Sequence, residues 1–250
     1  MKFLGIIPAR YASTRFPGKP LADMGGKPMI QRVYEAVAPH LDSVTVATDD
    51  HRIYDVVAAF GGSVVMTSPN HRSGTDRCYE AYGLTEGKFD VIINIQGDEP
   101  FIAPKQIGLL KSCFDAPNTD IATLVVPFGK AGGMAAVENP NSPKVVLDAS
   151  GQALYFSRSV VPFVRGVERE QWIEKQTFYK HIGLYAYRAE ALAQITRLAP
   201  SPLELAESLE QLRWIENGFR IQTAITDIET IGIDTPEDLE KALEMIQTCS

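Results

Sequence analysis

The fold is decided by a nearly unbroken apolar stretch in the first half of the chain, Phe89-Asp-Val-Ile-Ile-Asn-Ile-Gln96. A short apolar run without clean alternation is typical of a strand that is buried on both faces of a parallel sheet. Residues 3–8 form a second apolar run, which we interpret as the first strand of the same sheet.

Helical and strand patterns alternate on both sides of this stretch. Apolar spacing predicts helices at residues 28–40, 51–60, 76–82 and 105–114, and further strands at residues 43–48, 63–66 and 120–126. Asp50 is expected to be the N-cap of the second helix. Alternation of this kind indicates βαβ units, and we predict an α/β three-layer sandwich with a mostly parallel central sheet.

The middle of the chain has a different pattern, with strands predicted at residues 144–147, 153–157 and 180–187 and few helices between them. Along the last of these, Ile182 and Leu184 alternate with His181 and Tyr185, so the two pairs are expected on opposite faces. We therefore predict one domain over residues 1–250, with an inserted antiparallel lobe at about residues 135–190.

The last quarter of the chain returns to the α/β pattern. Helices are predicted at residues 190–197 and 202–216, followed by strands at residues 219–226 and 230–233. In the helix at residues 202–216, Leu205, Leu209 and Leu212 are expected to face the core. A final helix is signalled by Thr235 as N-cap, with Pro236 in the first helical position.

The composition excludes several classes of protein. The chain of 250 residues is 45% hydrophobic and 22% charged, as in ordinary globular proteins. No apolar run approaches the ~20 residues of a membrane-spanning helix, and the run at residues 3–7 is too short for a signal peptide. Three scattered cysteines without a CxxC pair indicate neither a disulfide framework nor a zinc site, so the cytoplasm is the expected compartment. The net charge of −7 argues against nucleic-acid binding by bulk attraction.

A basic segment follows the first strand, Pro8-Ala-Arg-Tyr-Ala-Ser-Thr-Arg-Phe-Pro-Gly-Lys-Pro-Leu21. Residues 1–22 carry four cations and no acid. The segment is not a Walker A loop, because Ser13 stands where that motif needs glycine and Pro20 replaces its Ser or Thr. Three cations at intervals of four to five residues suit a triphosphate, whose charge needs several donors. The alternative is a solvated basic face.

Two carboxylates are predicted to follow strands at the same edge of the sheet. Asp98 lies in Gln96-Gly-Asp-Glu-Pro100, directly after the apolar stretch, and Asp234 precedes the final helix. Mg²⁺ prefers one or two carboxylates together with substrate phosphates and water. We therefore favour a magnesium site beside the basic loop. The alternatives are a helix-capping acid for Asp234 and a turn residue for Asp98.

Eight segments, in consistent order over about residues 3–240, resemble the 3-deoxy-manno-octulosonate cytidylyltransferase (CMP-Kdo synthetase) family. Besides the basic segment and the turn that contains Asp98, they are Ser73-Gly-Thr-Asp-Arg77, Tyr155-Phe-Ser-Arg158, Lys180-His-Ile-Gly-Leu-Tyr185, Pro200-Ser-Pro-Leu-Glu204, Leu209-Glu-Gln-Leu-Arg213 and Asp234-Thr-Pro-Glu-Asp238. One such segment is weak support, whereas eight in order are strong.

The resemblance implies a fold like that of the nucleotide-diphospho-sugar transferases and a cytoplasmic, Mg²⁺-dependent homodimer that acts in lipopolysaccharide biosynthesis. Such an enzyme joins CTP to the acid sugar Kdo and releases pyrophosphate, with no nucleic-acid or membrane partner. The implied CTP ligands are Arg10, Ser13, Arg15, Lys19 and Arg77. The implied metal ligands are Asp98 and Asp234, which with Arg10 and Lys19 make up the expected catalytic set. The implied sugar ligands are Gln96, Arg158, His181, Tyr185, Glu210 and Gln211.

The residue pattern by itself supports some of these assignments and leaves others open. His181 shares a strand face with Tyr185, which favours sugar contact over burial, although a lone histidine is more often a structural hydrogen-bonding group. Glu210 and Gln211 would otherwise be read as a solvated helix face. The competing functions are a cytidylyltransferase for another acid sugar (amino-Kdo or sialic acid), a glycosyltransferase and a nucleotide sensor. No two aspartates stand two residues apart, which disfavours a glycosyltransferase with an Asp-x-Asp motif.

Overall fold

A computed structural model describes residues 1–12, 15–230 and 232–248 of the chain. The residues cluster into two compact units, unit 1 (residues 1–107 and 230–250) and unit 2 (residues 108–229). Each unit is described by itself. Within the described part of the chain, no helix has both the length and the apolar character needed to cross a bilayer.

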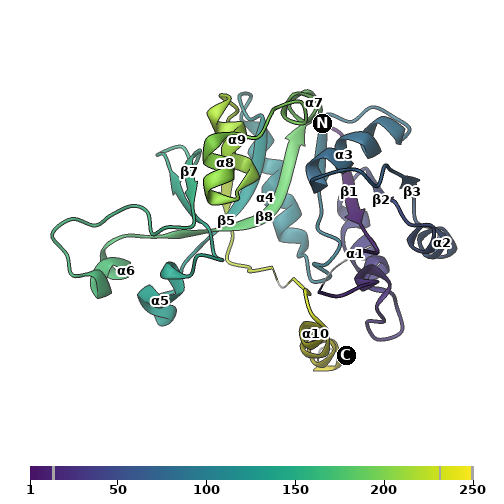
Figure 1. Ribbon diagram of the computed structural model, residues 1–250, viewed down its shortest axis with the longest axis horizontal. Helices are drawn as coiled ribbons and strands as arrows, with labels where there is room; N and C mark the ends of the chain where they lie inside the picture. Colours follow the sequence, from purple (N-terminus) through teal and green to yellow (C-terminus); the bar gives the residue numbers. More distant parts are fainter. Residues whose placement is uncertain (13–14, 231, 249–250) are drawn as a thin grey trace. The chain divides into compact units, whose positions relative to one another are not determined.

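Unit 1 contains a four-stranded parallel sheet in the order β3-β2-β1-β4 (Figure 1). Its strands are β1 (Phe3–Ala9), β2 (Ser43–Thr48), β3 (Val64–Met66) and β4 (Val91–Asn94). Its helices are α1 (Met29–Val37), α2 (His51–Ala59), α3 (Gly74–Leu84) and α10 (Pro236–Thr248), and α4 (Pro104–Ser112) runs across the boundary with unit 2. Short 3₁₀ turns occupy Lys19–Leu21 and Ala38–His40.

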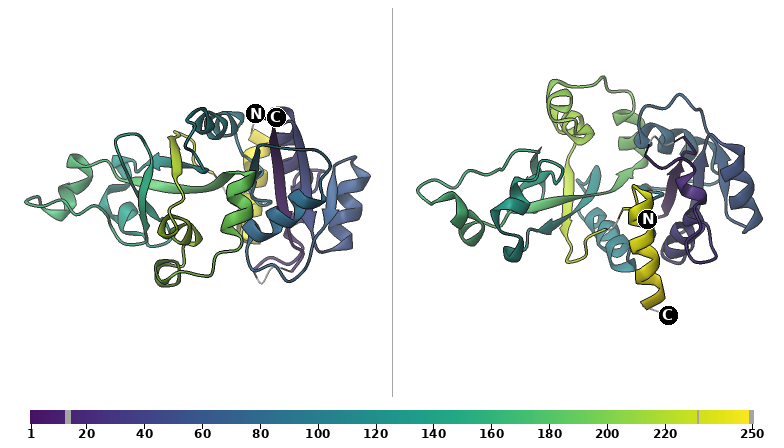
Figure 2. Two further views of the ribbon diagram at one scale, coloured as in Figure 1. Left: turned by 90° about the horizontal axis from the view of Figure 1, so that it is seen from above. Right: turned by 60° about the horizontal axis from the view of Figure 1, so that its bottom comes forward.

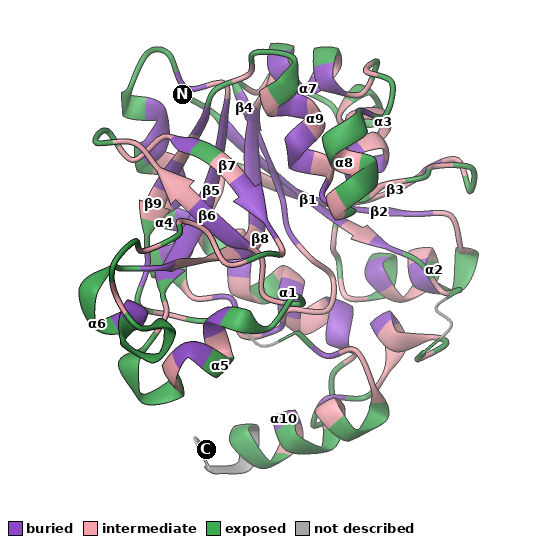
Figure 3. Ribbon diagram, turned by 60° about the vertical axis from the view of Figure 1, so that its left-hand side comes forward, coloured by how far each residue is buried: buried purple, intermediate pink, exposed green. Residues whose placement is uncertain are grey.

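The helices of unit 1 lie on both faces of this sheet, because the connections between its parallel strands are right-handed. The chain steps outward from β1 to β2 to β3 through α1 and α2, then returns through α3 to β4 on the other side of β1. Because such crossovers are right-handed, α1 and α2 cover one face and α3 covers the other. β1, β2 and β4 are mostly buried, β4 completely, as its apolar sequence predicts, whereas the residues of the edge strand β3 have intermediate exposure (Figure 3).

Unit 2 is richer in antiparallel pairing. β5 (Ile121–Pro127) pairs with β8 (Tyr179–Arg188) antiparallel and with β9 (Ile221–Ile225) parallel. β6 (Lys144–Leu147) pairs antiparallel with both β7 (Ala153–Ser157) and β8. Together with unit 1, this confirms the predicted α/β class with mostly parallel and some antiparallel strands. The predicted single domain and the bounds of the inserted lobe stay predictions.

The helices of unit 2 are short. They are α5 (Gly133–Glu138), α6 (Trp172–Lys175), α7 (Ala189–Ile195), α8 (Pro202–Glu207) and α9 (Glu210–Glu216). Three 3₁₀ turns lie at Cys113–Asp115, Lys130–Gly132 and Arg169–Gln171. The segments that carry α5 and α6 project from the strands of unit 2 in every view (Figures 1 and 2). They hold a separate apolar cluster that includes Met134, Trp172 and Phe178.

The predicted helix at residues 202–216 is wrong as a single element, because the chain breaks at Ser208. Ser208 has φ 51° and ψ 49°, the left-handed conformation that ends α8, and α9 begins two residues later. The break changes the helical phase, so Leu205 is 69% exposed while Leu209 and Leu212 are buried. Figure 3 shows α8 largely exposed and α9 with a buried face.

The predicted strand at residues 230–233 is also absent, since Thr230, Gly232 and Ile233 are not in a strand. Both predicted caps are present. The Asp50 side chain accepts a hydrogen bond from the Arg52 amide at 2.9 Å. Thr235 Oγ1 accepts one from the Asp238 amide at 3.3 Å, and Asp238 Oδ2 accepts one from the Thr235 amide at 3.0 Å.

Candidate active site

The basic loop of unit 1 is shaped by a turn at Gly18. This residue has φ 71°, a left-handed conformation that glycine adopts without strain, and its amide donates to the Tyr11 carbonyl at 2.9 Å. The 3₁₀ turn that starts at Lys19 follows directly. At the start of the loop, the guanidinium of Arg10 donates to the His71 carbonyl. Ser13 lies outside the described residues.

Lys19 contacts both of the carboxylates that the sequence places at this edge of the sheet. Its Nζ lies 2.6 Å from Asp98 Oδ2 and 3.3 Å from Asp234 Oδ1. Arg15 Nη1 lies 3.1 Å from Asp234 Oδ2. The lysine side chain is only 13% exposed, so its contacts with the two aspartates are shielded more than a surface pair would be. Two cations from the basic loop thus offset two carboxylates from distant segments.

Backbone contacts hold these segments together. The Ile233 amide donates to the Asp98 carbonyl at 2.9 Å, which ties the residue before Asp234 to the turn after β4. A Cβ on Gly97 would lie 3.0 Å from the Pro8 carbonyl, so only glycine permits this approach of the turn to the end of β1. The result is a pocket of about 250 Å³. Its polar lining side chains are Arg10, Lys19, Arg77, Gln96 and Asp98.

Arg77 forms a buried wall of this pocket. It is 1% exposed, and its Nη1 and Nη2 donate at 2.6 Å to Thr67 Oγ1 and Asp49 Oδ2. An arginine held in this way fixes the end of β2 and the segment after β3 against α3. The predicted contact of Arg77 and its neighbours with a cytidine base stays a prediction.

Asp98 and Asp234 are the residues of this unit that could hold a magnesium ion. Both offer hard oxygen donors beside one ammonium group, and Mg²⁺ is commonly held by one or two carboxylates plus phosphate oxygens. Among the described residues, no group of three His, Cys, Asp or Glu side chains is placed to hold a metal. The donor set therefore fits a metal that arrives with a phosphate-bearing substrate.

Glu99 is a neighbouring carboxyl that sequence reasoning passed over. Burial, and then the charge of Asp98, raises the pKa of Glu99 to about 7, although a hydrogen bond with the Thr230 side chain works in the opposite direction. Its Oε2 has no hydrogen-bond partner among the described residues. The only sequence signal was its position after Asp98, which is equally that of a turn residue before Pro100.

In unit 2, His181 and Tyr185 lie on the same face of β8, with ring centroids 5.2 Å apart. A bulge opposite Thr123 and Leu124 adds two residues to β8. Because two is an even number, the side chains of β8 before and after the bulge still alternate between the same two faces. Thr123 Oγ1 fills the bulge, 3.1 Å from His181 Nε2 and 2.9 Å from the Leu184 carbonyl. Desolvation lowers the pKa of His181 to about 3, so its imidazole is neutral at physiological pH.

Tyr185 Oη on β8 and three atoms on α9, Gln211 Nε2, Arg213 Nε and Trp214 Nε1, are buried and lack a hydrogen-bond partner among the described residues. The rings of Tyr185 and Trp214 meet edge to face at 5.2 Å. Burial first, and then Tyr187 and Glu210, raises the pKa of Tyr185 well above its usual value. Unit 2 thus brings His181, Tyr185 and Glu210 together, and Gln211 follows Glu210 on α9. Trp214 also belongs to this group, because its ring packs on Tyr185. The sequence did not predict this, since Trp214 lies at an apolar position of the helical pattern.

Arg158 is engaged by the backbone of the α8–α9 junction. Its Nε donates to the Glu207 carbonyl at 2.6 Å and its Nη2 to the Ser208 carbonyl at 3.2 Å, while Nη1 reaches the Pro140 carbonyl at 2.9 Å. The Glu207 carboxylate in turn accepts from Ser157 Oγ at 2.7 Å and from the Arg158 amide at 2.8 Å. The predicted grip of Arg158 on a sugar carboxylate stays a prediction.

Comparisons with known proteins agree with one another. A family model described as cytidylyltransferase matches residues 4–231. The 3-deoxy-manno-octulosonate cytidylyltransferase of Parabacteroides distasonis is 66% identical over 98% of both chains, and that of Bacteroides thetaiotaomicron is 63% identical over the full length of both.

Solved structures extend this likeness to three dimensions. A structure of CMP:2-keto-3-deoxy-manno-octonic acid synthetase complexed with CTP matches with a TM-score of 0.90 and 42% identity over both complete chains. The 4-diphosphocytidyl-2C-methyl-D-erythritol synthase of Anaerococcus prevotii shares the fold, with a TM-score of 0.61 and 13% identity over 98% of this chain and 99% of that one.

Proposed function

This chain belongs to the cytidylyltransferase family, and from that premise we propose that it transfers CMP from CTP to Kdo, giving CMP-Kdo and pyrophosphate. The product is the activated form of the sugar for lipopolysaccharide biosynthesis. One observation carries the proposal beyond the family name: Lys19 Nζ lies 2.6 and 3.3 Å from Asp98 and Asp234, beside a pocket at the end of a parallel strand. Ligands of open α/β sheets bind at this end of the strands.

Charge neutralisation is the main demand of this reaction. An acid sugar and a triphosphate are both anions, and two unit charges 4 Å apart repel by about 4 kcal/mol at an effective dielectric constant of 20. Left unscreened, that repulsion would slow the reaction by about a thousandfold. The acid-free stretch that contains Arg10, Arg15 and Lys19 supplies the opposing charge in a protein whose net charge is −7.

The reaction is an in-line displacement at the α-phosphorus of CTP. The anomeric hydroxyl oxygen of Kdo forms the new P–O bond, the bond to the bridging α–β oxygen breaks, and pyrophosphate leaves with the electron pair. The sugar hydroxyl loses its proton in the process. Little covalent chemistry falls to the protein in such a transfer, so positioning and charge stabilisation carry the catalysis.

We propose Asp98 and Asp234 as the residues that hold Mg²⁺. When bound, the ion would neutralise phosphate charge and orient the triphosphate. The two carboxylates suit this task because they are already held side by side by Lys19 and by the Ile233–Asp98 backbone hydrogen bond. Lys19 and Arg15 are then the groups that compensate the phosphates, together with Arg10.

We assign the acid sugar to the group of side chains around Tyr185 in unit 2. Kdo is a polyhydroxylated carboxylate and needs hydrogen-bonding partners along its length. Three of the buried polar atoms that lack a partner among the described residues, on Tyr185, Gln211 and Trp214, are of the kind that a bound polar ligand satisfies. His181 is assigned sugar contact rather than proton transfer, because its lowered pKa makes it a poor base.

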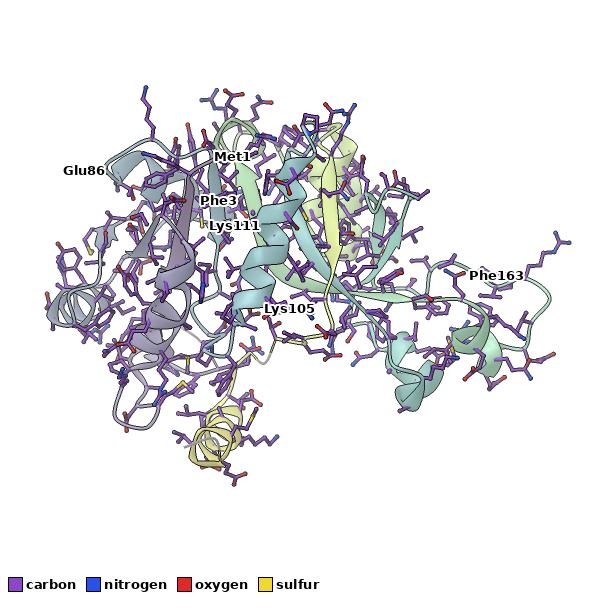
Figure 4. All side chains as sticks on the ribbon, turned by 180° about the vertical axis from the view of Figure 1, so that it is seen from behind. Met1, Phe3, Glu86, Lys105, Lys111 and Phe163 are labelled. Carbon is purple, nitrogen blue, oxygen red and sulfur yellow. The ribbon has the colours of Figure 1, made fainter. Side chains whose placement is uncertain are left out.

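The protein is further proposed to be a cytoplasmic homodimer that assembles through the lobe at about residues 135–190. Support for this surface comes from Phe163, which is 74% exposed on the segment between β7 and β8 (Figure 4) and packs edge to face on Trp172 at 4.8 Å. Light scattering would report a dimer for the wild-type protein. A monomer at micromolar concentration would contradict this part of the proposal.

The experiment that tests the function is pyrophosphate release from CTP with a panel of acid sugars and Mg²⁺. Kdo should give the highest kcat/KM, and amino-Kdo and sialic acid should be poorer substrates. A preference for either of the latter would replace Kdo by that sugar. Nucleotide binding without any release of pyrophosphate would indicate a nucleotide sensor instead.

A further inference from the structure

Arg213 joins three separate segments of unit 2 through three different nitrogen atoms. Its Nη1 donates to the Leu198 carbonyl at 2.9 Å and its Nη2 donates to Glu210 Oε1 at 2.8 Å. Its Nε forms an ion pair with Glu204 Oε2 at 3.2 Å, but this buried nitrogen makes no hydrogen bond among the described residues. The side chain is 12% exposed. An arginine in this position acts as a brace between the loop after α7, the first turn of α8 and the first turn of α9.

The contacts of Arg213 lie on both sides of Ser208, the residue of this region with an unfavourable backbone conformation. Ser208, between α8 and α9, holds a left-handed conformation that disfavours residues other than glycine, typically by about 1 kcal/mol. The orientation of α9 relative to α8 therefore cannot rest on backbone preference alone. Arg158 and Glu207 secure the junction on one side. On the other side, Arg213 ties α9 to the loop after α7 through the Leu198 carbonyl and holds Glu210 within the first turn of α9.

Glu210 is where this brace meets the proposed sugar site. Its charge is among the causes that raise the pKa of Tyr185, which places the carboxylate within electrostatic reach of that phenol. The next residue, Gln211, is buried and has an amide nitrogen without a partner. Any rotation of the first turn of α9 would move both side chains relative to β8.

We propose that Arg213 is a positioning residue that fixes the carboxylate of Glu210 for contact with the hydroxyl groups of the acid sugar. The inference rests on the proposed function, and it assigns a role to a residue outside the expected sugar-binding set. Arg213 acts only through Glu210. Its two terminal nitrogens already donate hydrogen bonds to Leu198 and Glu210, and the contact with the sugar is made by the glutamate.

Lysine could not replace this arginine. Each of the three partners faces a different nitrogen of one planar guanidinium group. The ammonium of a lysine is instead a single charged nitrogen at the end of a flexible side chain. A lysine at position 213 would keep the charge and lose the geometry. Arg213→Lys is therefore the variant that separates positioning from simple charge compensation.

The test is a double-mutant cycle of Arg213→Lys and Glu210→Gln in the full-length protein, with the KM for CTP and the KM for Kdo measured separately. Arg213→Lys should raise the KM for Kdo by about tenfold, the scale of one charge-assisted hydrogen bond, and leave the KM for CTP within about twofold. In the Glu210→Gln background the same change should have little further effect, because coupled residues are not additive.

Arg188→Lys is the matched control. Arg188 also belongs to unit 2 and donates from Nε to a backbone carbonyl, that of Thr119, at 2.7 Å. It should change thermal stability as much as Arg213→Lys does and leave the KM for Kdo unchanged. Glu204→Gln removes the second carboxylate but keeps the contact with Glu210, so it should also leave the KM for Kdo within about twofold.

Three results would overturn the proposal: an unchanged KM for Kdo in Arg213→Lys, full additivity with Glu210→Gln, or an equal rise of the KM for Kdo in Glu204→Gln. Should Arg213→Lys fail to fold, the same cycle with Glu210→Gln is run on Arg213→Gln, and an unchanged KM for Kdo in that variant would overturn the proposal. A wild-type protein that releases no pyrophosphate with Kdo would refute the proposed function itself, and the role of Arg213 with it.

Discussion

The two groups of candidate site residues are built from different kinds of side chain. In unit 1, Lys19 and Arg15 pair with Asp98 and Asp234, and the charges largely compensate one another. In unit 2, Tyr185 and Trp214 each carry a buried polar atom that has no hydrogen-bond partner in the described part of the chain, and the neighbouring imidazole is neutral. The first arrangement suits a ligand that replaces these ion pairs with its own, such as a triphosphate that pairs with the cations while its metal pairs with the carboxylates. The second suits a ligand that supplies hydrogen bonds, such as a sugar.

This difference predicts opposite responses to substitution. A change in unit 1 should weaken use of CTP and its metal strongly, because each pair removed leaves an uncompensated charge. A change in unit 2 should weaken use of Kdo and cost little stability, because the polar atoms there are not yet satisfied. Each variant below tests one side of this contrast.

The largest effect is expected for Asp98→Asn. Loss of this carboxylate removes a proposed metal ligand and leaves Lys19 with one acidic partner, so turnover should fall by about a thousandfold, equivalent to about 4 kcal/mol. The measurement is pyrophosphate release as a function of Mg²⁺ concentration, with circular dichroism to verify the fold. Asp55→Asn, at an exposed position on α2, is the control. Near-normal activity and metal dependence would exclude Asp98 as a ligand.

A smaller effect is expected for Lys19→Met. Loss of one charge-assisted contact of about 1.5–3 kcal/mol should weaken CTP affinity by about 10–150-fold and leave the KM for Kdo nearly unchanged. Without CTP, the two carboxylates are released from the ammonium, so Mn²⁺ should bind more tightly than to the wild type. Calorimetry with each ligand checks both expectations, and Lys27→Met, which breaks the exposed pair with Glu35, is the control. A defect confined to Kdo would remove Lys19 from the triphosphate site.

The neutral imidazole of unit 2 makes stability depend on pH. The pKa of His181 is lowered to about 3 in the folded protein, against about 6.5 in the unfolded chain. Between these values the unfolded state binds more protons, so stability falls as the pH falls, by about 2 kcal/mol at pH 5. Urea unfolding at pH 7 and pH 5 should show this loss in the wild type and a smaller one in His181→Gln. The exposed His51→Gln should behave like the wild type, and an equal loss in all three proteins would contradict the account.

The smallest effect is expected for Tyr185→Phe. It should raise the KM for Kdo by about fivefold to tenfold, the scale of one hydrogen bond, and leave CTP affinity unchanged. Because the hydroxyl has no hydrogen-bond partner among the described residues, its removal should not lower the free energy of unfolding. Tyr179→Phe, on the same strand, is the control. A stability loss with an unchanged KM would make Tyr185 a structural residue.

The contrast between the two groups also explains what could be predicted from the sequence. The charged group was foreseen because two signals are visible in the sequence: an acid-free basic segment in an acidic protein, and a carboxylate in the turn after an apolar strand. The strand expected before Asp234 is not formed by the described residues, and Asp234 is held instead by Lys19 and by the Ile233–Asp98 backbone hydrogen bond. The apolar stretch at residues 89–96 likewise predicted a buried parallel strand, and β4 is fully buried. Local chemistry decides both of these features.

The features that were missed depend on contacts between distant residues. The left-handed conformation of Ser208 has no local signal, since Ser is neither Gly nor Asn, and its carbonyl accepts a hydrogen bond from Arg158, the residue after β7. Similarly, Arg158 looks free in sequence, yet three of its nitrogens donate to backbone carbonyls. Trp214 occupies an ordinary core position in the helical pattern, and only its packing on Tyr185 reveals an unsatisfied donor.

One isotope experiment tests the central claim, that the sugar hydroxyl displaces pyrophosphate at the α-phosphorus. Kdo freshly labelled with ¹⁸O at the anomeric hydroxyl is mixed with CTP, Mg²⁺ and the wild-type protein, and the products are followed by ³¹P NMR. The label should appear as an isotope shift on the phosphodiester phosphorus of CMP-Kdo and be absent from pyrophosphate. Label in pyrophosphate, or free CMP without a phosphodiester, would contradict the account.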